Sequence, residues 1–320
     1  KDPFFVEFGE GCERRQRNLR KLVDRAAKYG IRVYLYLNEP RPMPCAFFEK
    51  SDAYRACRGT LEWRGIVNAM CTRSPEVRRW LGDAVEQVFR AAPGLGGVLT
   101  ISGSENLTHC LAHGPKSVYE NDPSGYCKPE KFCRRCEKLT MDESVADLNR
   151  VIADGVRRAD PAARVIVWDW GWKEPGRTEL GTVTSAIARL KGSGVSFMTV
   201  SERDKPIDVG GVAVRLNEYA LSQVGPSELS LAKWRAATAA GLPTVAKAQV
   251  ASSWEMSVVP YVPVMDNVAE HAFNLMKAGV KGSMLSWSCG CYPAPNLEVF
   301  TGVRTTDRSA ADVLDRVAVA

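Results

Sequence analysis

The sequence predicts an α/β protein, and the best architecture for it is a (β/α)8 barrel, with an open doubly wound sheet as the alternative. Short apolar runs rich in β-branched residues alternate with amphipathic helical patterns along the chain. The strand patterns are apolar on both faces, which is typical of a parallel sheet covered by helices. A barrel needs about 250 residues, so residues 1–320 suit one domain with long loops.

Six apolar runs predict buried strands, and the run "FFVEF" at 4–8 is a further candidate. The last run is followed by one helical pattern and is most simply strand eight, which makes 31–37 strand three. One strand is not found at the front, so we expect this fragment to lack the first strand of the barrel. The six runs are 31–37, 96–102, 163–170, 195–201, 243–250 and 282–288.

Amphipathic patterns between the strands predict the covering helices. Ser74-Pro75-Glu76 is a helix start, and glycines such as Gly30 and Gly279 mark helix ends. Two long loops, 38–75 and 103–142, follow predicted strands three and four; the second is an insertion with a cysteine cluster. The predicted helices cover 13–29, 76–91, 143–158, 178–191, 229–240, 266–279 and 308–317.

Composition excludes several classes of protein. Apolar residues make up 45% and charged residues 25% of the chain, as in an ordinary globular enzyme. The net charge is +6 but the basic residues are scattered, so we expect no nucleic-acid partner. No apolar run is long enough to span a membrane. Location stays open, with a cytoplasmic protein favoured over an exported one, although the chain begins at Lys1 and an upstream segment is expected to have been removed.

Acidic residues at the carboxyl ends of barrel strands are the candidates for chemistry, because barrel active sites lie on that face. They are Glu39, Glu105, Asp169, Glu202 and Glu255. The strand count places Glu105 after strand four and Glu255 after strand seven, where they can face one another across the barrel mouth. Glu39 and Glu202 form a rival pair with the same separation, but accepting them would leave the last strand without a place.

Three stretches carry a resemblance to a known family: Glu105 in "ISGSENL", Glu255 in "ASSWEMS", and Trp287-Ser288 at the end of the last strand. The chain resembles the retaining glycoside hydrolases of the (β/α)8 superfamily, which have catalytic glutamates on strands four and seven. The resemblance implies that Glu105 is the acid/base, Glu255 the nucleophile and Trp287 the floor of a sugar subsite. Retention requires two carboxyl groups about 5–5.5 Å apart. A carbohydrate substrate and no organic cofactor are implied.

Ser104 stands where the superfamily has an asparagine that binds the sugar 2-hydroxyl. This difference points to 2-acetamido sugars and to a hexosaminidase-like alternative, in which Glu105 is the acid and the acetamido group of the substrate attacks. A non-catalytic carbohydrate-binding barrel is a second alternative. A zinc-dependent hydrolase is a third.

Polar and aromatic residues near the strand ends are expected to bind the sugar. Aromatic rings suit the C–H-rich faces of pyranoses, with core packing as the alternative for each tryptophan. The expected substrate-binding residues are Asn38, Glu39, Arg41, Asn106, Asp169, Trp170, Trp172, Glu202, Tyr219, Trp254 and Trp287.

Four cysteines in the 103–142 loop predict a structural zinc site. "FCRRC" has the Cys-x2-Cys spacing of a zinc knuckle, and four thiolates fit a tetrahedral ion. His109 is an alternative ligand, and two disulfides are the alternative in an exported protein. The predicted ligands are Cys110, Cys127, Cys133 and Cys136; Cys12, Cys45, Cys57, Cys71, Cys289 and Cys291 are interpreted as small buried apolar residues.

Overall fold

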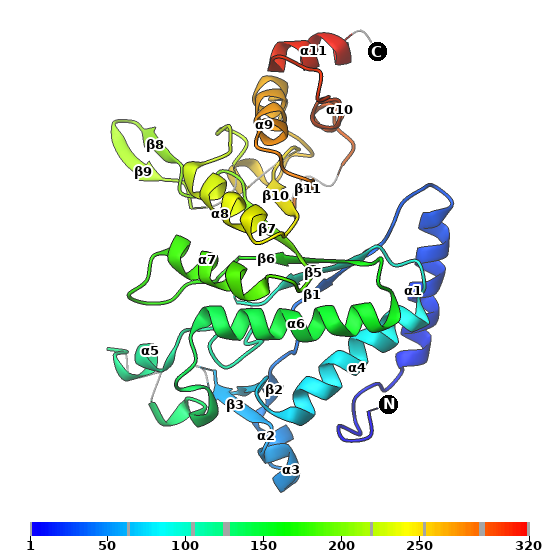
Figure 1. Cartoon of the computed structure of the whole chain (residues 1–320), viewed down its shortest axis with the longest axis vertical. Coiled ribbons are helices and arrows are strands. Elements are labelled where there is room, and N and C mark those ends of the chain that lie inside the picture. The colour runs from blue at the N-terminus through cyan, green and yellow to red at the C-terminus, as the bar shows by residue number, and fades with distance from the viewer. Residues whose placement is uncertain are drawn as a thin grey trace. The chain divides into compact units, whose positions relative to one another are not determined.

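The chain folds into two compact units, Lys1–Ser196 and Phe197–Ala320. The expectation of one catalytic domain over the whole chain stays a prediction. Figure 1 shows the elements of each unit. The computed structural model describes residues 2–62, 65–103, 106–123, 129–217, 220–251, 254–287 and 292–318.

The first unit is built on three parallel strands in the order β1 (Tyr34–Leu37), β5 (Gly97–Ile101) and β6 (Arg164–Trp168). Every residue of β5 is buried, as expected of the central strand of a covered parallel sheet. Along the helical layer α6 packs against both α4 and α7, and α1 contacts α4 (Figure 1). The helices are α1 (Cys12–Ala27), α4 (Pro75–Ala91), α6 (Met141–Ala159) and α7 (Glu179–Leu190).

The long helix α6 is fixed by its start and by one close crossing. Thr140 and Glu143 form a capping box, in which the Thr140 N–H donates to Glu143 Oε2 at 3.1 Å. Where α6 crosses α4, a Cβ on Gly155 would lie 2.5 Å from the carbonyl oxygen of Gly82, so only glycine permits this approach. Small residues at the crossing therefore set the distance between the two helices.

Loop 38–75 contains a small antiparallel sheet that the sequence did not predict. Its strands have the order β2 (Met43–Pro44), β4 (Val67–Met70) and β3 (Arg58–Leu61). Two short helices, α2 (Cys45–Phe48) and α3 (Asp52–Arg55), lie between β2 and β3 in the chain.

Residues 4–8 are turns, so the prediction of a strand there was wrong. The Asp2 carboxylate accepts the backbone N–H groups of Phe4 and Phe5 at 2.9 and 2.7 Å, which closes a turn in place of a sheet ladder. The apolar residues of this run instead enter an aromatic cluster over α2 and α3. The Phe5 ring lies within 6.0 Å of the rings of Phe4, Phe8, Phe47, Tyr54 and Trp80.

The 103–142 insertion is mostly irregular. Its described regular elements are α5 (Lys116–Glu120) and two 3-10 turns, η1 (Pro129–Lys131) and η2 (Arg134–Cys136). The Tyr119 and Phe132 rings pack edge to face, 5.3 Å apart. Few backbone ladders hold the insertion, so side-chain contacts must fix its path.

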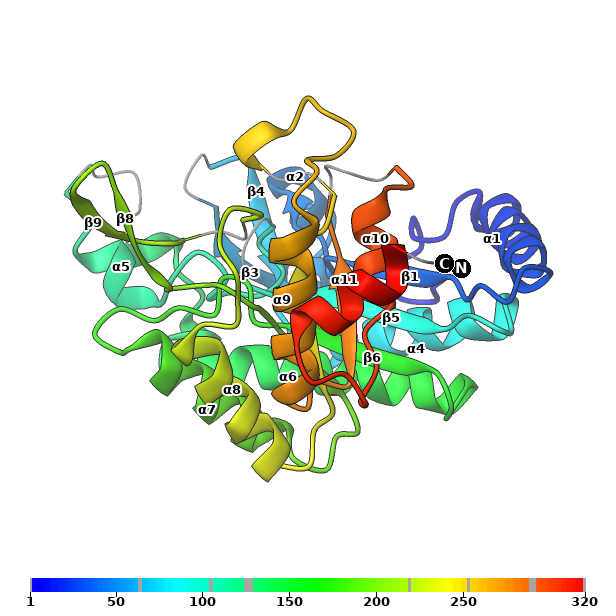
Figure 2. The same ribbon diagram turned by 90° about the horizontal axis from the view of Figure 1, so that it is seen from above.

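The second unit repeats the parallel pattern with β7 (Ser196–Val200), β10 (Thr244–Ala248) and β11 (Gly282–Leu285) in that order. The hairpin of β8 (Pro206–Val209) and β9 (Val212–Arg215) projects from this unit (Figures 1 and 2). Helices α10 and α11 pack on α9. The remaining elements are α8 (Glu228–Ala239), η3 (Trp254–Met256), α9 (Met265–Lys277), α10 (Pro295–Thr301) and α11 (Ala310–Ala318).

The α/β class and all six main strands are confirmed, as are the seven predicted helices to within a few residues. A complete eight-stranded barrel is not shown, because the described residues hold six parallel strands, three in each unit. None of the described helices is both long and apolar enough to cross a bilayer.

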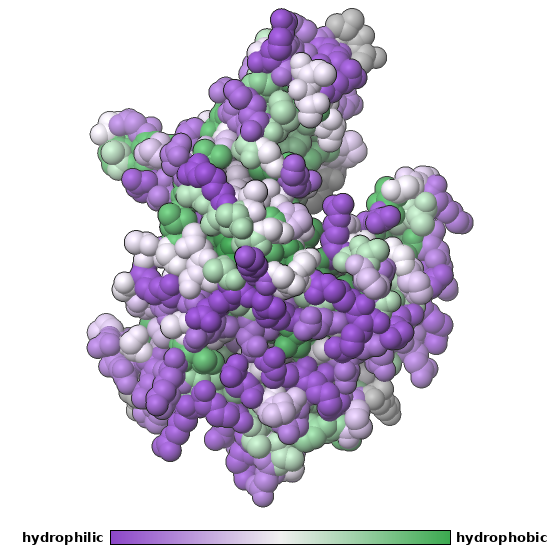
Figure 3. All heavy atoms as spheres, viewed as in Figure 1, coloured by the Kyte–Doolittle hydropathy of each residue, from purple (hydrophilic) through white to green (hydrophobic). Residues whose placement is uncertain are grey.

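The visible face of the first unit is largely hydrophilic over α4 and α6 (Figure 3). Ion pairs join the two helices there: Arg158 contacts Glu86 at 2.5 Å and Asp83 at 3.1 Å. Since such exposed pairs each contribute little, the apolar inner faces supply most of the stability of this layer.

We expect Phe5→Ala to lower the free energy of unfolding by about 3–5 kcal/mol, because it removes a fully buried ring and leaves a cavity. Urea denaturation followed by fluorescence measures the loss. Val6→Ala is the matched control, since Val6 is 64% exposed and should change the value by less than about 0.5 kcal/mol. Equal effects of the two substitutions would contradict the aromatic cluster.

Candidate active site

In the first unit, hydrogen bonds converge on Ser102, directly after β5. Its carbonyl oxygen accepts from Thr108 Oγ1 at 3.2 Å and lies 2.7 Å from His109 Nε2. Its hydroxyl oxygen accepts from Asn149 Nδ2 at 3.0 Å and Trp172 Nε1 at 3.2 Å. The described chain on both sides of 104–105 is thereby fixed, although nothing in the sequence had singled out Ser102.

His109 is a structural residue of this loop and is 1% exposed. Burial lowers its pKa to about 4, so the imidazole is neutral at physiological pH. Nδ1 accepts the Leu111 N–H at 3.2 Å, which leaves the proton on Nε2 for the Ser102 carbonyl. Because both ring nitrogens are engaged, His109 is not available as a metal ligand.

Three of the predicted residues, Glu105, Tyr219 and Cys127, lie outside the described residues. Asn106 is half-buried, and its carbonyl oxygen accepts the Thr108 N–H at 2.8 Å. The predicted acid/base therefore remains a proposal that rests on the sequence.

After β1, Glu39 and Arg41 bind each other. The Glu39 carboxylate accepts the Arg41 N–H at 2.8 Å and lies 3.5 Å from Arg41 Nε. Burial raises the pKa of Glu39, and the contacts with Arg41 oppose that shift. Asn38 is 2% exposed and donates to the Tyr36 hydroxyl at 2.9 Å. The contacts of Glu39 and Arg41 thus lie within their own loop.

After β6, the predicted sugar-binding tryptophans differ in exposure. Trp172 is fully buried and belongs to the core through its bond to Ser102, so its ring has no free face for a substrate. Trp170 is half-buried and packs against Trp168, with ring centroids 5.5 Å apart. Asp169, which lies between Trp168 and Trp170 in the chain, is buried. Core packing was the alternative stated for each tryptophan, and for Trp172 it is the correct one.

In the second unit, Glu202 is completely buried just after β7. Its Oε1 accepts the Ala220 N–H at 2.8 Å. Burial raises the pKa of Glu202 to about 8, although that hydrogen bond and the charge of Lys247 act in the opposite direction. Glu202 is consequently a neutral carboxylic acid at neutral pH.

His271, on α9, lies beside this acid, with Nε2 3.9 Å from Glu202 Oε2. Burial, followed by the charge of Lys205, lowers the pKa of His271 to about 4. Its Nε2 also contacts the Ser201 hydroxyl at 2.5 Å. A neutral imidazole faces a neutral acid, so no ion pair forms between them at neutral pH.

Glu255, in η3, is exposed but firmly held. Its carboxylate accepts the N–H groups of Leu221 and Ser222 at 2.7 and 3.4 Å and also the Ser222 hydroxyl. The adjacent amides of Ala220 and Leu221 therefore bind Glu202 and Glu255, and the charge of Glu255 contributes to the raised pKa of Glu202. One short segment holds two carboxyl groups in different environments.

Two predicted aromatic residues of the second unit, Trp254 and Trp287, are more accessible than Trp172. Trp254, adjacent to Glu255 in the chain, is 57% exposed, and Trp287 is half-buried. An exposed ring beside an exposed carboxylate suits a sugar ring better than a buried tryptophan does.

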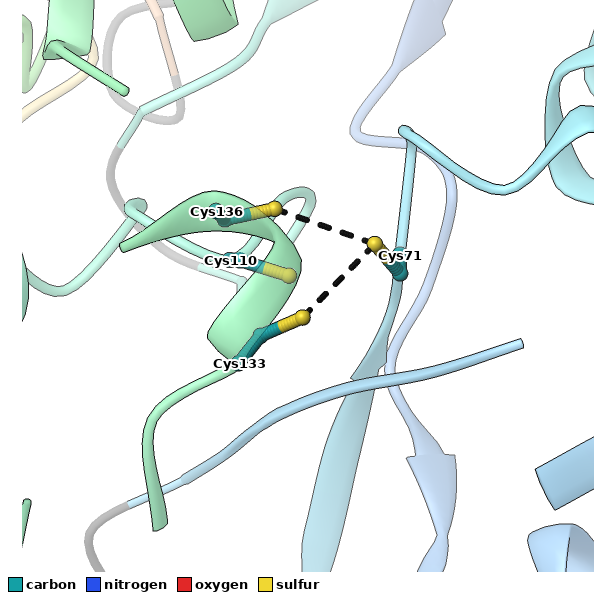
Figure 4. A group of neighbouring side chains, drawn as sticks. All are labelled: Cys71, Cys110, Cys133 and Cys136. Carbon is teal, nitrogen blue, oxygen red and sulfur yellow. Dashed lines mark hydrogen bonds between the residues drawn. The ribbon is translucent and has the colours of Figure 1, made fainter. Parts of the chain in front are cut away.

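Four cysteines of the first unit form a cluster, the Cys tetrad: Cys71, Cys110, Cys133 and Cys136. All four are buried, and their sulfur atoms lie within 4.8 Å of one another (Figure 4). Cys71, directly after β4, was interpreted as a small buried apolar residue, so the tetrad corrects that interpretation. Cys110, Cys133 and Cys136 come together as predicted.

The tetrad cysteines are free thiols and form no disulfide. Hydrogen bonds with Cys110, Cys136 and Cys71 hold the pKa of the Cys133 thiol far below its ordinary value. The other described cysteines, Cys12, Cys45 and Cys57, are also free. The disulfide alternative therefore fails for every described cysteine.

No protein-family model matches the chain, and no curated protein does either. Among solved structures, it is similar to the catalytic domain of a beta-amylase from Paenibacillus polymyxa, with 9% identity, a TM-score of 0.47 and coverage of 93% of this chain and 84% of that chain. A family 89 glycoside hydrolase from Clostridium perfringens matches at 11% identity and a TM-score of 0.49, over 93% of this chain and 27% of that one.

The old yellow enzyme from Trypanosoma cruzi matches at 11% identity and a TM-score of 0.43, over 84% of this chain and 67% of that chain. At such identities and TM-scores these likenesses carry no information about activity.

The raised pKa of Glu202 makes stability depend on pH. Between the ordinary value of 4.5 and about 8, the folded protein keeps a proton that the unfolded chain has lost, so the free energy of unfolding falls as pH rises. Glu202→Gln, which mimics the neutral acid, should lose this dependence. Its free energy of unfolding relative to wild type should then rise by up to about 1.4 kcal/mol per pH unit.

Urea denaturation at several pH values across this window measures that difference. Glu270→Gln is the matched control, because Glu270 is exposed on α9. Parallel pH profiles for wild type and Glu202→Gln would show that Glu202 does not retain its proton on folding.

Proposed function

We propose that the protein is a glycoside hydrolase that acts with retention, with Glu255 as nucleophile and Glu105 as acid/base. The observation that carries the proposal is the setting of Glu255. Its carboxylate is exposed, so a substrate can reach it, and donors at 221 and 222 hold it from a segment remote in sequence. A catalytic group has to be both accessible and rigidly supported.

Hydrogen bonds to Glu255 stabilise its charged form, which is the form that attacks. In the proposed reaction a Glu255 oxygen forms a bond to the anomeric carbon while the glycosidic bond breaks, and Glu105 gives its proton to the leaving oxygen. Glu105 then removes a proton from water, which displaces Glu255 and releases the sugar. The exposed Trp254 ring lies next in the chain to Glu255 and suits one face of a pyranose.

Glu202 is a second candidate for the proton donor. It is neutral at neutral pH, as a general acid has to be, and it shares the 220–221 segment with Glu255. Its complete burial instead favours a supporting role, in which a neutral side chain beside Glu255 adds no second negative charge. The two roles differ in their kinetic consequences.

The hexosaminidase-like alternative assigns the attack to the acetamido group of the substrate. Glu255 would then stabilise or orient without forming a bond to the sugar. A carbohydrate-binding barrel without activity is the other alternative, and its aromatic surface would bind sugars that are never cleaved.

We expect Glu255→Gln and Glu105→Gln to lower kcat/KM on aryl glycosides, N-acetylhexosaminides included, by about 10²–10⁴-fold or more. Glu270→Gln is the matched control, because Glu270 is exposed on α9 and is not among the predicted site residues, and it should stay within about threefold of wild type. Glu39→Gln tests the rival pair. Circular dichroism verifies that each variant is folded.

Leaving-group dependence separates the two acids. A variant without its acid should recover on substrates with a good leaving group, which needs no protonation. Such recovery in Glu202→Gln but not in Glu105→Gln would transfer the acid role to Glu202. Loss of activity in Glu39→Gln alone would refute the assignment of Glu255, and sugar binding without turnover in wild type would favour the binding protein.

A further inference from the structure

We propose that the Cys tetrad binds one Zn²⁺ in a closed structural site. The ligands would be the sulfur atoms of Cys71, Cys110, Cys133 and Cys136, and Cys127 would not be a ligand. Zinc binding at the tetrad does not depend on the proposed function, because zinc content is measured without any substrate.

The sulfur–sulfur distances fit a tetrahedral zinc ion. Zn–S bonds of about 2.3 Å in a tetrahedron place sulfur atoms about 3.8 Å apart. Cys71 Sγ lies 3.7 Å from Cys136 Sγ and 3.8 Å from Cys133 Sγ. A disulfide would require about 2.05 Å, which none of these free thiols approaches.

Three separate segments bring the ligands together. Cys71 follows β4, Cys110 lies beyond β5, Cys133 directly precedes the η2 turn and Cys136 is its last residue (Figure 4). Within that turn the Cys136 N–H donates to the Cys133 carbonyl at 2.9 Å, while the Arg135 N–H hydrogen-bonds the Cys133 sulfur. A backbone donor to sulfur supports a thiolate, which is the form that binds metal.

Arg135 supplies positive charge where the site needs it. Four thiolates around Zn²⁺ carry a net charge of −2, which is costly to bury without a counter-charge. The Arg135 guanidinium contacts the Cys133 side chain and donates to the carbonyl oxygens of Ala56 and of Arg58, the latter at 2.8 Å. These two acceptors belong to the segment entering β3, so the cation is held beside the tetrad.

The neighbouring chain packs closely against the tetrad. A Cβ on Gly59 would lie 2.7 Å from Cys110 Sγ, so the chain passes the tetrad where only glycine fits. The backbone N–H of Cys133 is held by Thr60 Oγ1 at 3.1 Å, and Thr60 is fully buried. His109 is engaged through both ring nitrogens, which leaves four sulfur ligands.

A site with four protein ligands has no position for water or substrate, so the ion would be structural. It would join the antiparallel sheet in loop 38–75 to the 103–142 insertion, which has few backbone ladders of its own. Because metal binding to such a site is coupled to folding, removal of the ion should loosen the insertion.

Elemental analysis of the full chain, purified without chelator and supplied with ZnSO4, tests the proposal. We expect about one zinc per chain in wild type and in Cys127→Ser, and at least about tenfold less in Cys71→Ser. The two variants form a matched pair, since each removes one thiol and only Cys71 belongs to the tetrad.

Wild type that takes up no zinc would overturn the site, and loss of zinc in Cys127→Ser but not in Cys71→Ser would overturn the ligand set. If Cys71→Ser is insoluble, X-ray absorption of the wild-type zinc protein tests the ligand set instead. Four sulfur atoms at about 2.3 Å are expected, and a nitrogen or oxygen ligand in the shell would refute the tetrad.

Discussion

The convergence of hydrogen bonds on Ser102 is the constraint on which the loop after β5 depends. Two side-chain donors reach its hydroxyl oxygen and two side chains reach its carbonyl oxygen. Loss of either Ser102 acceptor would leave buried donors unpaired and lower the free energy of unfolding. These hydrogen bonds therefore hold the loop in one conformation. Cys110 lies in the same loop, and its sulfur atom is within 4.8 Å of that of Cys71. A segment with almost no secondary structure thus acquires a fixed path near Glu105 in the chain.

In the second unit, two carboxyl groups are held near one backbone segment. Mutual repulsion of two charges is avoided because Glu202 is buried and neutral, whereas Glu255 is exposed and surrounded by donors. Neighbouring amides at 220 and 221 hold both groups. Environments that separate the protonation states of two acids are the physical requirement for acid and base to act together.

Local pattern was sufficient for the α/β class, six strands and their helices, because apolar periodicity is set by burial. The same pattern gave a wrong prediction at 4–8. There the Asp2 carboxylate closes a turn, and the aromatic side chains of the run pack in a cluster. Cys71 was missed since its partners lie far along the chain and only the fold brings their sulfur atoms together. The neutral state of Glu202 was likewise beyond reach of the sequence, because it depends on complete burial.

The contrast between Glu39 and Glu255 shows why a position at a strand end is a weak guide to catalysis. Glu39 directly follows β1, yet its carboxylate binds the backbone and side chain of Arg41, two residues away. Such a contact forms within one loop and moves with it. Glu255 instead accepts hydrogen bonds from Leu221 and Ser222, so the tertiary fold sets its position. Because catalysis requires a group to be held against the rest of the site, these long-range contacts favour Glu255.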